Sequence, residues 1–140
     1  MNKKYSIKSI KNGVEYDSIL ETSSINNDFV IKYASEVLGI ICESRGTHPF
    51  VVLQRLREIL EKDNVLLLCK GNRLDVHPSG GLLIGIGALK LQIGRRVDIT
   101  TDIVKIFDPE IETLMLATVD KQNDYYDEWL NSIRGLGYDD

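Results

Sequence analysis

The stretch from Thr47 to Asn64, THPFVVLQRLREILEKDN, restricts the fold more than any other part of the sequence. Its apolar residues recur at helical spacing and predict one buried stripe, made of Val52, Leu53, Leu56, Ile59 and Leu60. The residues between them are predicted to face outward: Arg55, Arg57, Glu58, Glu61 and Lys62. Thr47 is a suitable N-cap, and Pro49 falls in the first turn, where its missing N–H costs nothing. The sequence therefore predicts an amphipathic helix that needs an apolar surface on one side.

A hairpin is predicted near the N-terminus, in KYSIKSIKNGVEYDSIL. Tyr5 and Ile7 share one face, and Asn12-Gly13 is the strongest short hairpin-turn dipeptide. The following stretch, from Ser23 to Gly46, has polar residues at spacings that trace one narrow helical stripe: Asp28, Lys32, Ser35, Glu36, Gly39 and Glu43. We therefore expect a central helix there, capped by Asn27 and covered on most sides.

The middle of the chain reads as short strands around tight turns. NVLLLCKG predicts a buried strand, Lys70-Gly71-Asn72 a turn, and RLDVHP a returning strand that Pro78 ends. Strand alternation would put Arg73, Asp75 and His77 together on one solvent-facing side. ALKLQIG alternates as well, which predicts a strand with its apolar side chains turned inward, namely Leu89, Leu91 and Ile93.

The segment 95–118 gives mixed signals. DIVKIFD fits a short helix that ends before Pro109, whereas TLMLATV fits either a strand or the run into the last helix. DKQNDYYDEWLNSIRG is clearly helical, with Thr118 or Asp120 as the cap and Gly135 as the stop. Its apolar stripe contains Val119, Tyr126, Trp129, Leu130 and Ile133.

Tight hairpins with helices between them, rather than regular βαβ units, predict the α+β class. The chain has 140 residues, of which 43% are hydrophobic and 27% charged, as in ordinary globular domains. We expect a single α+β domain spanning residues 1–140, in which a mostly antiparallel sheet packs against about three to four helices.

Charge and hydrophobicity narrow the class of partner. The lysines near the N-terminus are followed by no apolar stretch of a signal peptide, and the longest apolar run, LLIGIGAL, is far shorter than the roughly 20 residues of a membrane span. We expect a cytoplasmic protein that contacts no membrane. With 17 basic and 21 acidic residues, the net charge of −4 disfavours direct binding to nucleic acid and suits a basic protein partner.

The motifs that carry chemistry do not fit their usual spacings. Two cysteines and two histidines equal the ligand count of a structural zinc site, but five residues separate Cys42 from His48 and seven separate Cys69 from His77. The glycines of the Gly80–Gly87 segment lack the third glycine of a dinucleotide fingerprint, because Lys90 occupies that position. No Gly-x-Ser-x-Gly elbow is present. We therefore expect no metal, no cofactor and no catalytic residue.

Two alternatives stay open. One is a small-ligand or nucleotide-binding regulatory domain that uses the Gly80–Gly87 segment. The other is an enzyme that uses Arg73, Asp75 and His77.

An acidic and aromatic group on the last helix is the remaining feature. Asp124, Tyr125, Asp127 and Glu128 fall off the apolar stripe, so we expect them to be exposed. Such residues form an ordinary solvated helix face in many proteins. Tyrosine among carboxylates also suits a protein-binding patch, because aromatic rings anchor interfaces and charges steer association.

Several motifs from Thr47 to Ile133 resemble a group of small bacterial immunity proteins, including those of contact-dependent growth inhibition systems. The motifs are LLLCKGNRLDVHPSGG, GALKLQIG, DIVKIFDP and TVDKQNDYYDEWL, and the most specific marks are the Leu-Cys-x-Gly-x-Arg-x-Asp-Val run and the Pro-Ser-Gly after it. An aromatic residue often stands in that group where this chain has His77. This departure argues against a metal ligand shared by the group at that position.

The resemblance implies a cytoplasmic inhibitor that binds the C-terminal domain of a cognate toxin, commonly a nuclease acting on RNA, and blocks its active site. No catalytic residue carries over, because the role of such proteins is binding. The acidic balance of the chain agrees with a basic partner of this kind. From the residues alone, we expect the partner-binding positions to be Asp124, Tyr125, Asp127, Glu128, Arg73, Asp75 and His77.

Overall fold

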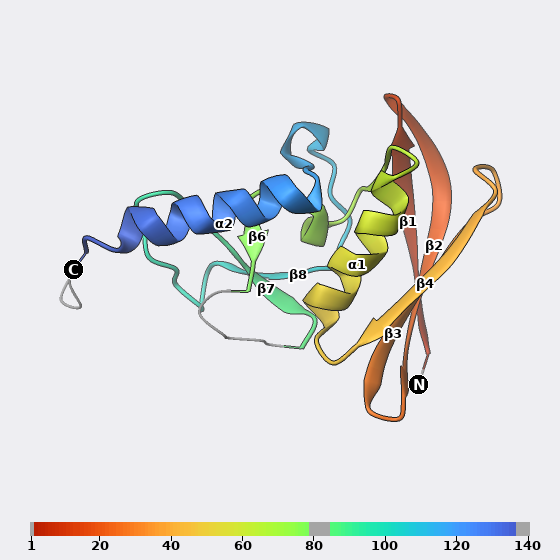
Figure 1. Cartoon of the computed structure of the whole chain (residues 1–140), viewed down its shortest axis with the longest axis horizontal. Coiled ribbons are helices and arrows are strands. Elements are labelled where there is room, and N and C mark those ends of the chain that lie inside the picture. Colours follow the sequence, from red (N-terminus) through yellow and green to blue (C-terminus); the bar gives the residue numbers. More distant parts are fainter. Residues whose placement is uncertain (1, 79–84, 137–140) are drawn as a thin grey trace.

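The computed structural model describes residues 2–78 and 85–136 of the chain (Figure 1). A five-stranded antiparallel sheet has the order β4-β3-β2-β1-β5, and a smaller sheet has the order β6-β7-β8. The strands are β1 (Lys3–Lys11), β2 (Val14–Ile25), β3 (Asp28–Ser35), β4 (Ile40–Gly46), β5 (Val65–Leu67), β6 (Val76–His77), β7 (Gly87–Lys90) and β8 (Ile103–Lys105). The helices are α1 (Pro49–Glu61) and α2 (Val119–Ile133), with short 3-10 turns η1 (Lys70–Asn72) and η2 (Thr113–Met115).

The predicted N-terminal hairpin is confirmed. β1 pairs with β2 along the whole length of β1, from Lys3 opposite Thr22 to Lys11 opposite Val14. Asn12 and Gly13 form the turn with φ values of +52° and +78°. A two-residue turn with both φ values positive matches the twist of the flanking strands, and asparagine followed by glycine adopts it at low cost.

The central helix expected between Ser23 and Gly46 is wrong, because this stretch forms the end of β2 followed by strands β3 and β4. Asn26 and Asn27 both adopt positive φ, at +51° and +69°, and turn the chain from β2 into β3. β3 then alternates, with Ile31 and Tyr33 fully buried and Lys32 exposed between them. The polar spacing that suggests a helix also permits strands, and the two-asparagine turn together with β-branched residues decides for strands.

The amphipathic helix predicted after Thr47 is confirmed as α1, which packs on β3, β4 and β5. Its buried residues form most of one core with the inner side of the large sheet: Phe50, Val52, Leu53, Leu56 and Leu60. Three details differ from the prediction. His48, rather than Thr47, is the N-cap residue, Ile59 is 39% exposed, and Arg57 is only 1% exposed.

The stretch after α1 does not fold back on itself. β5 pairs with β1, and η1 follows it at the predicted turn. The predicted returning strand then leaves the large sheet, because β6 pairs with β7 instead of β5. Gly71 lies so close to its neighbours that a Cβ there would come within 2.6 Å of Leu53 Cδ2. This close approach explains why the turn needs glycine.

The segment 95–118 contains less helix than predicted. DIVKIFD includes β8, an extended strand beside β7, and TLMLATV includes η2. Two of the three predicted inward residues of the preceding strand are buried, whereas Ile93 is 39% exposed beyond the end of β7. The expectation of three to four helices is therefore wrong: the described residues contain two α-helices, within the predicted α+β arrangement of a mostly antiparallel sheet.

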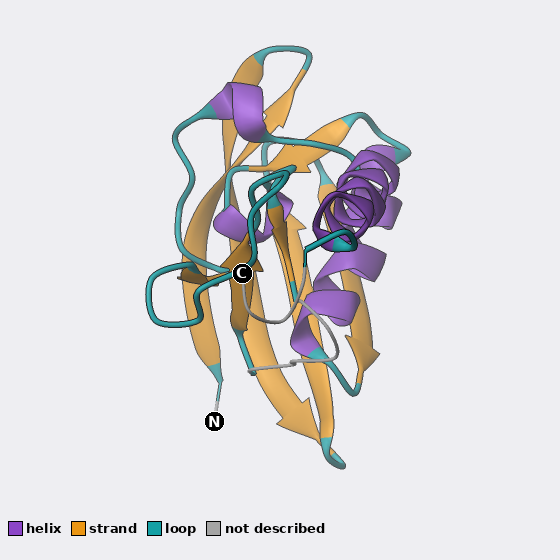
Figure 2. Cartoon of the chain, turned by 90° about the vertical axis from the view of Figure 1, so that its left-hand side faces the viewer, coloured by secondary structure: helices purple, strands orange, loops and turns teal. Residues whose placement is uncertain are grey.

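The helices and the smaller sheet of the described part lie on one side of the large sheet. Figure 1 shows the sheet nearly edge-on, with α1, α2 and the smaller sheet to one side of it. Figure 2, turned by a quarter rotation, shows both helices in front of the long strands. We call the uncovered side of β1–β4, which carries Lys4, Ile19, Lys32 and Ile41, the outer face. Neither helix of the described part is long and apolar enough to cross a membrane.

Candidate partner-binding surface

Helix α2 carries a row of exposed carboxylates, which we call the acidic stripe: Asp120, Asp124, Asp127 and Glu128. Asp124 stands three or four residues from each of the others, so all four lie on one side of the helix. None of the ion pairs among the described residues includes any of them. Like charges at these spacings cost about 0.2–0.5 kcal/mol per pair. Repulsion among these four carboxylates therefore slightly lowers the stability of the isolated protein.

The three predicted carboxylates of this helix are exposed, but Tyr125 is half-buried, against the prediction. Its hydroxyl donates to the carbonyl of Leu91 at 3.5 Å. Burial, followed by the charge of Asp75, raises the pKa of Tyr125 above its usual value. The ring therefore packs between α2 and the smaller sheet.

A polar hollow of about 390 Å³ lies beside Tyr125, with Asp75, Lys90, Arg95 and Asp102 also in its wall. Arg95 Nη1 lies 3.3 Å from Asp102 Oδ2, so these two residues of the wall form an ion pair. The structure thus brings together Asp75 and Tyr125, which lie 50 positions apart in the sequence.

The opposite side of α2 is anchored by Trp129, which is 2% exposed. Its indole Nε1 donates to the carbonyl of Arg95 at 2.8 Å, and its ring packs with Leu89 and Leu91. Thr118 caps the first turn by accepting from the N–H of Lys121, as predicted. A tryptophan that is both buried and hydrogen-bonded fixes the rotation of the helix, and so the direction in which the stripe points.

Gln122 connects α2 to the turn that follows β5. It is completely buried, and the two hydrogens of its Nε2 are shared among three carbonyls within hydrogen-bond distance, those of Gly71 (2.9 Å), Arg73 (2.8 Å) and Val76 (2.9 Å). Its Oε1 accepts from Arg57 Nη1 at 2.6 Å and from Gln54 Nε2 at 3.1 Å. One side chain thereby satisfies backbone that no strand partner reaches.

Arg57 completes this connection from α1. Its Nη1 also donates to the carbonyl of Gly71 at 3.1 Å, and its Nη2 donates to the carbonyl of Ala117 at 2.8 Å. Burial lowers the pKa of Arg57 to about 10, which still leaves the guanidinium charged at neutral pH. The outward orientation predicted for Arg57 is therefore wrong, because its donors bind three acceptors from distant parts of the chain, on Gly71, Ala117 and Gln122.

The solvent-facing side predicted for Arg73 and Asp75 is also wrong: they are 6% and 7% exposed. Arg73 Nε and Nη2 donate to the two carboxylate oxygens of Asp75, at 2.8 and 2.9 Å, and Nη1 donates to Glu110 Oε1 at 2.9 Å. Hydrogen bonding to Asp75 raises the pKa of Arg73. The reason for the burial is Glu110, which arrives from a loop 37 positions away and covers the guanidinium.

Glu110 itself is 4% exposed. Burial alone would raise the pKa of this carboxyl, but the N–H of Glu112, the guanidinium of Arg73 and the ammonium of Lys70 lower it to about 2. These three residues form a closed ionic network around Glu110. Because both oxygens of Asp75 are already occupied by Arg73, the network has a structural role.

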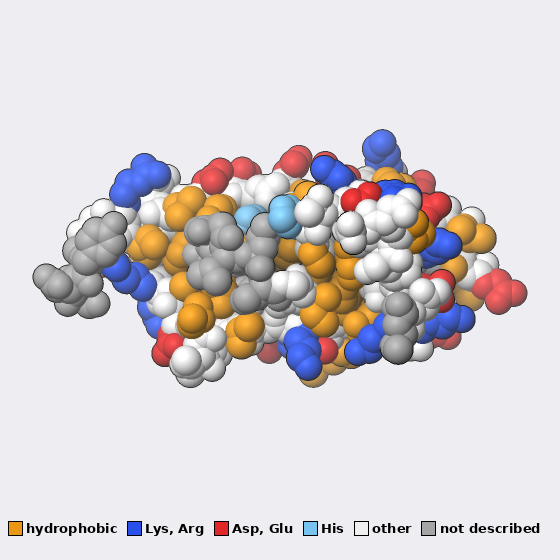
Figure 3. All heavy atoms as spheres, turned by 90° about the horizontal axis from the view of Figure 1, so that it is seen from below, with side chains coloured by type: hydrophobic (Ala, Val, Ile, Leu, Met, Phe, Trp, Pro, Cys, Tyr) orange, Lys and Arg blue, Asp and Glu red, His pale blue; other side chains and the backbone are white. Residues whose placement is uncertain are grey.

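His77 lies half-buried between two aromatic rings. It stacks on Tyr126, with ring centroids 4.0 Å apart and an interplanar angle of 12°, and it tilts against Phe50 at 5.0 Å. Burial lowers the pKa of His77 below its usual value. Figure 3 shows histidine side chains at the surface beside hydrophobic ones.

Gln122 and Arg57 are the important residues that sequence reasoning missed. Gln122 follows Val119 by three positions and precedes Trp129 by seven, so it stands on the apolar stripe of its helix. Arg57 likewise stands seven positions after Phe50 and three before Leu60. A polar residue on an apolar stripe is the signal that finds both, since such a residue must be hydrogen-bonded when buried.

The described residues give no support for a metal site or for a reactive cysteine. Among the described residues, no three histidine, cysteine, aspartate or glutamate side chains are close enough to hold a metal ion. Cys69 is fully buried, and burial raises the pKa of its thiol to about 11. Most of the Gly80–Gly87 segment lies outside the described residues, so the nucleotide-binding alternative has no structural description here.

No protein-family model matches the chain, and no curated protein matches it either.

Proposed function

We propose that this protein is a cytoplasmic immunity protein that binds and neutralises a cognate bacterial toxin domain, a nuclease acting on RNA. The observation that carries the proposal is the acidic stripe, a set of unpaired carboxylates held on a helix with a fixed orientation. The resemblance of several motifs to those of immunity proteins and the net charge of −4 support the same function.

The charge of the stripe suits a nuclease. Proteins that act on nucleic acid present lysine and arginine to the phosphates of their substrate. An inhibitor whose carboxylates face that basic surface attracts the toxin from a distance and competes with the substrate for it. In the complex, the basic partner also relieves the repulsion between Asp124 and its neighbours. On the face seen in Figure 3, by contrast, positive and negative side chains are mixed.

The anchoring of α2 supports binding as well. Gln122 and Trp129 attach the helix to two different parts of the structure, through seven hydrogen-bond and packing partners that are mostly buried. A preorganised surface loses little conformational entropy when a partner binds, so more of the interaction energy appears as affinity.

The direct test is co-expression with the toxin domain encoded beside the gene of this protein. We expect the full chain to protect growing cells and to co-purify with the toxin domain. If the chain neither protects nor co-purifies, the proposed function is wrong.

The surface is tested by two variants of equal net charge. The first neutralises the stripe with D120N, D124N, D127N and E128Q. The control neutralises four exposed acids elsewhere with E15Q, E36Q, E58Q and D63N. Loss of protection in the stripe variant alone supports the assignment, whereas equal protection by both variants removes the stripe from the interface.

A further inference from the structure

The outer face of the large sheet carries a row of alternating charge. Lys4 stands directly opposite Glu21, Glu21 opposite Lys32, and Lys32 opposite Glu43, so the row crosses β1, β2, β3 and β4 in the order plus, minus, plus, minus. None of the ion pairs among the described residues involves these four side chains. We call them the charged row.

A second row lies two residues away from the charged row on each strand. It contains three apolar side chains and one serine, and we call it the apolar row. Here Ser6 faces Ile19, Ile19 faces Ala34, and Ala34 faces Ile41. Ile41 is 86% exposed on the edge strand β4, and Ile19 is 46% exposed. Burying these two β-branched side chains against a partner would contribute favourable free energy.

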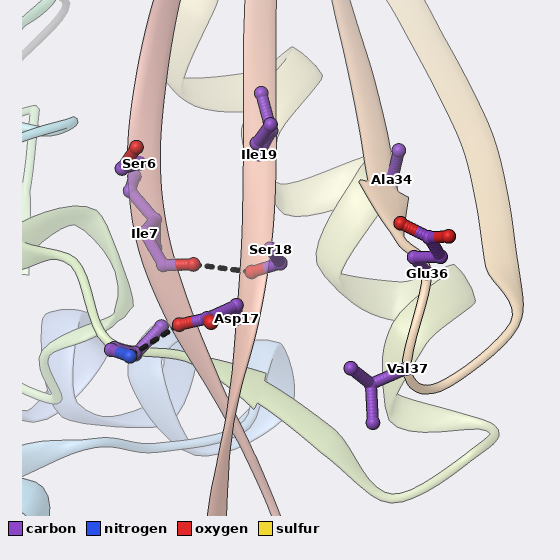
Figure 4. A pocket seen from close by; sticks show the side chains of 9 residues that line it. Ser6, Ile7, Asp17, Ser18, Ile19, Ala34, Glu36 and Val37 are labelled. Carbon is purple, nitrogen blue, oxygen red and sulfur yellow. Dashed lines mark hydrogen bonds and ion pairs between the residues drawn. The ribbon is translucent and has the colours of Figure 1, made fainter.

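The small side chains of the same row leave a hollow. It has a volume of about 500 Å³, and its wall includes Ser6, Ile19, Ala34, Glu36 and Val37 (Figure 4). Lys8 and Asp17, which form an ion pair across β1 and β2, border it on one side. The apolar row therefore has a depression over β1–β3 and a protruding isoleucine on β4.

Both rows are complementary to themselves. A two-fold axis parallel to the strands and midway between β2 and β3 brings the outer faces of two copies together. In this arrangement β1 of one copy packs on β4 of the other, and β2 packs on β3, at the same level along the strands. Lys4 of one copy then faces Glu43 of the other, and Glu21 faces Lys32, so all four contacts join opposite charges. In the neighbouring row, the protruding Ile41 of one copy enters the hollow beside Ser6 of the other.

We propose that two copies of this chain pack through their outer faces in this arrangement. Packing two sheets with their strands nearly aligned is one of the two common geometries of stacked sheets. From strand spacing and rise, the four strands cover roughly 19 Å by 30 Å, or about 600 Å² on each copy. Two such faces exceed the roughly 1,000 Å² that a specific interface needs. The acidic stripe, on the other side of the large sheet, stays free.

The test uses a charge swap within one chain and sedimentation equilibrium of the purified protein. For the natural sequence, we expect the average mass to rise from 15.8 kDa toward twice that value at micromolar concentrations. E43K places lysine opposite Lys4 in both symmetry-related contacts, so we expect the dimer dissociation constant to rise at least about ten-fold. K4E/E43K restores both contacts and should restore the dimer. E15K is the matched control, because Glu15 is an exposed acid of β2 outside both rows.

I41K tests the apolar row independently, since Ile41 is exposed in the single copy and its replacement leaves the core intact. We expect this variant to stay monomeric. A natural chain that is monomeric at all concentrations overturns the proposal. A dimer that E43K weakens no more than E15K does also overturns the proposal. The same holds for a dimer that K4E/E43K fails to restore, which is the result expected if two copies paired edge to edge through β4. A natural chain that is monomeric and loses toxin binding through I41K would assign the outer face to the toxin instead, and would also overturn the proposal.

Discussion

Replacing Gln122 by methionine tests how α2 is held. Methionine has nearly the same length and shape, so Q122M removes the hydrogen bonds of the amide without leaving a large cavity. The carbonyls of Gly71 and Arg73 keep their bonds from Arg57 Nη1 and from the N–H of Val76, whereas the carbonyl of Val76 loses the donor described for it and Arg57 loses its bond to the amide oxygen. Each buried carbonyl left without a partner costs about 1–3 kcal/mol. We therefore expect Q122M to reduce the free energy of unfolding by about 3 kcal/mol.

Urea denaturation measures this loss. With a slope of about 2 kcal/mol per molar urea, the midpoint should fall by about 1.5 M without a change of slope. The matched control is Q54M, the same chemical change at the half-buried neighbour that donates to Gln122 and Asn123. It should cost less than about 1 kcal/mol, because water reaches that site. Equal losses in Q122M and Q54M would refute the role of Gln122 as the anchor of α2.

The remaining predictions concern the turn, the ionic network and the stacked histidine. G71A should reduce the free energy of unfolding by about 2–3 kcal/mol, measured by urea denaturation, because its Cβ would lie 2.6 Å from Leu53 Cδ2 and 3.1 Å from the carbonyl oxygen of Ile106. The pKa of Glu110 is about 2 in the folded protein and 4.5 in the free side chain, so roughly 3 kcal/mol of stability should be lost as the pH falls from about 4.5 to 2. E110Q should remove most of that loss, and an unchanged acid transition would contradict the network. The lowered pKa of His77 means that the unfolded chain binds the proton more tightly, so stability should fall as the pH drops below about 6.5. H77F should keep the stack on Tyr126 and flatten the pH dependence of the melting temperature near pH 6, and an equal slope in both proteins would show that another group titrates.

Local signals predict the elements whose residues decide their own conformation. Asn12 and Gly13 specify a turn by themselves, and the stripes of α1 and α2 repeat over several turns, so all three predictions are confirmed. The stretch from Asp28 to Gly46 shows the limit. Its polar residues fit a helix, but pairing with β2, which lies earlier in the chain, makes it a hairpin of strands.

The residues of the candidate surface differ in the same way: some positions depend on local sequence, and others depend on distant segments. The carboxylates Asp124, Asp127 and Glu128 are exposed as predicted, because the period of one helix determines which side they occupy. Arg73 and Asp75 are buried in an ionic network that Glu110 completes from a distant loop, and no pattern near Arg73 indicates a partner 37 positions away. Burial that depends on a distant segment is not readable from local alternation.

The most direct test of the central claim is the rate at which the protein associates with its cognate toxin domain, measured as a function of ionic strength. If the acidic stripe steers binding, the rate constant of the natural protein should fall about ten-fold or more as salt screens the charges. The variant with D120N, D124N, D127N and E128Q should associate slowly at low salt and respond weakly to added salt. The variant with E15Q, E36Q, E58Q and D63N should behave like the natural protein. Equal rates and equal salt dependence for the natural protein and the stripe variant would contradict the account.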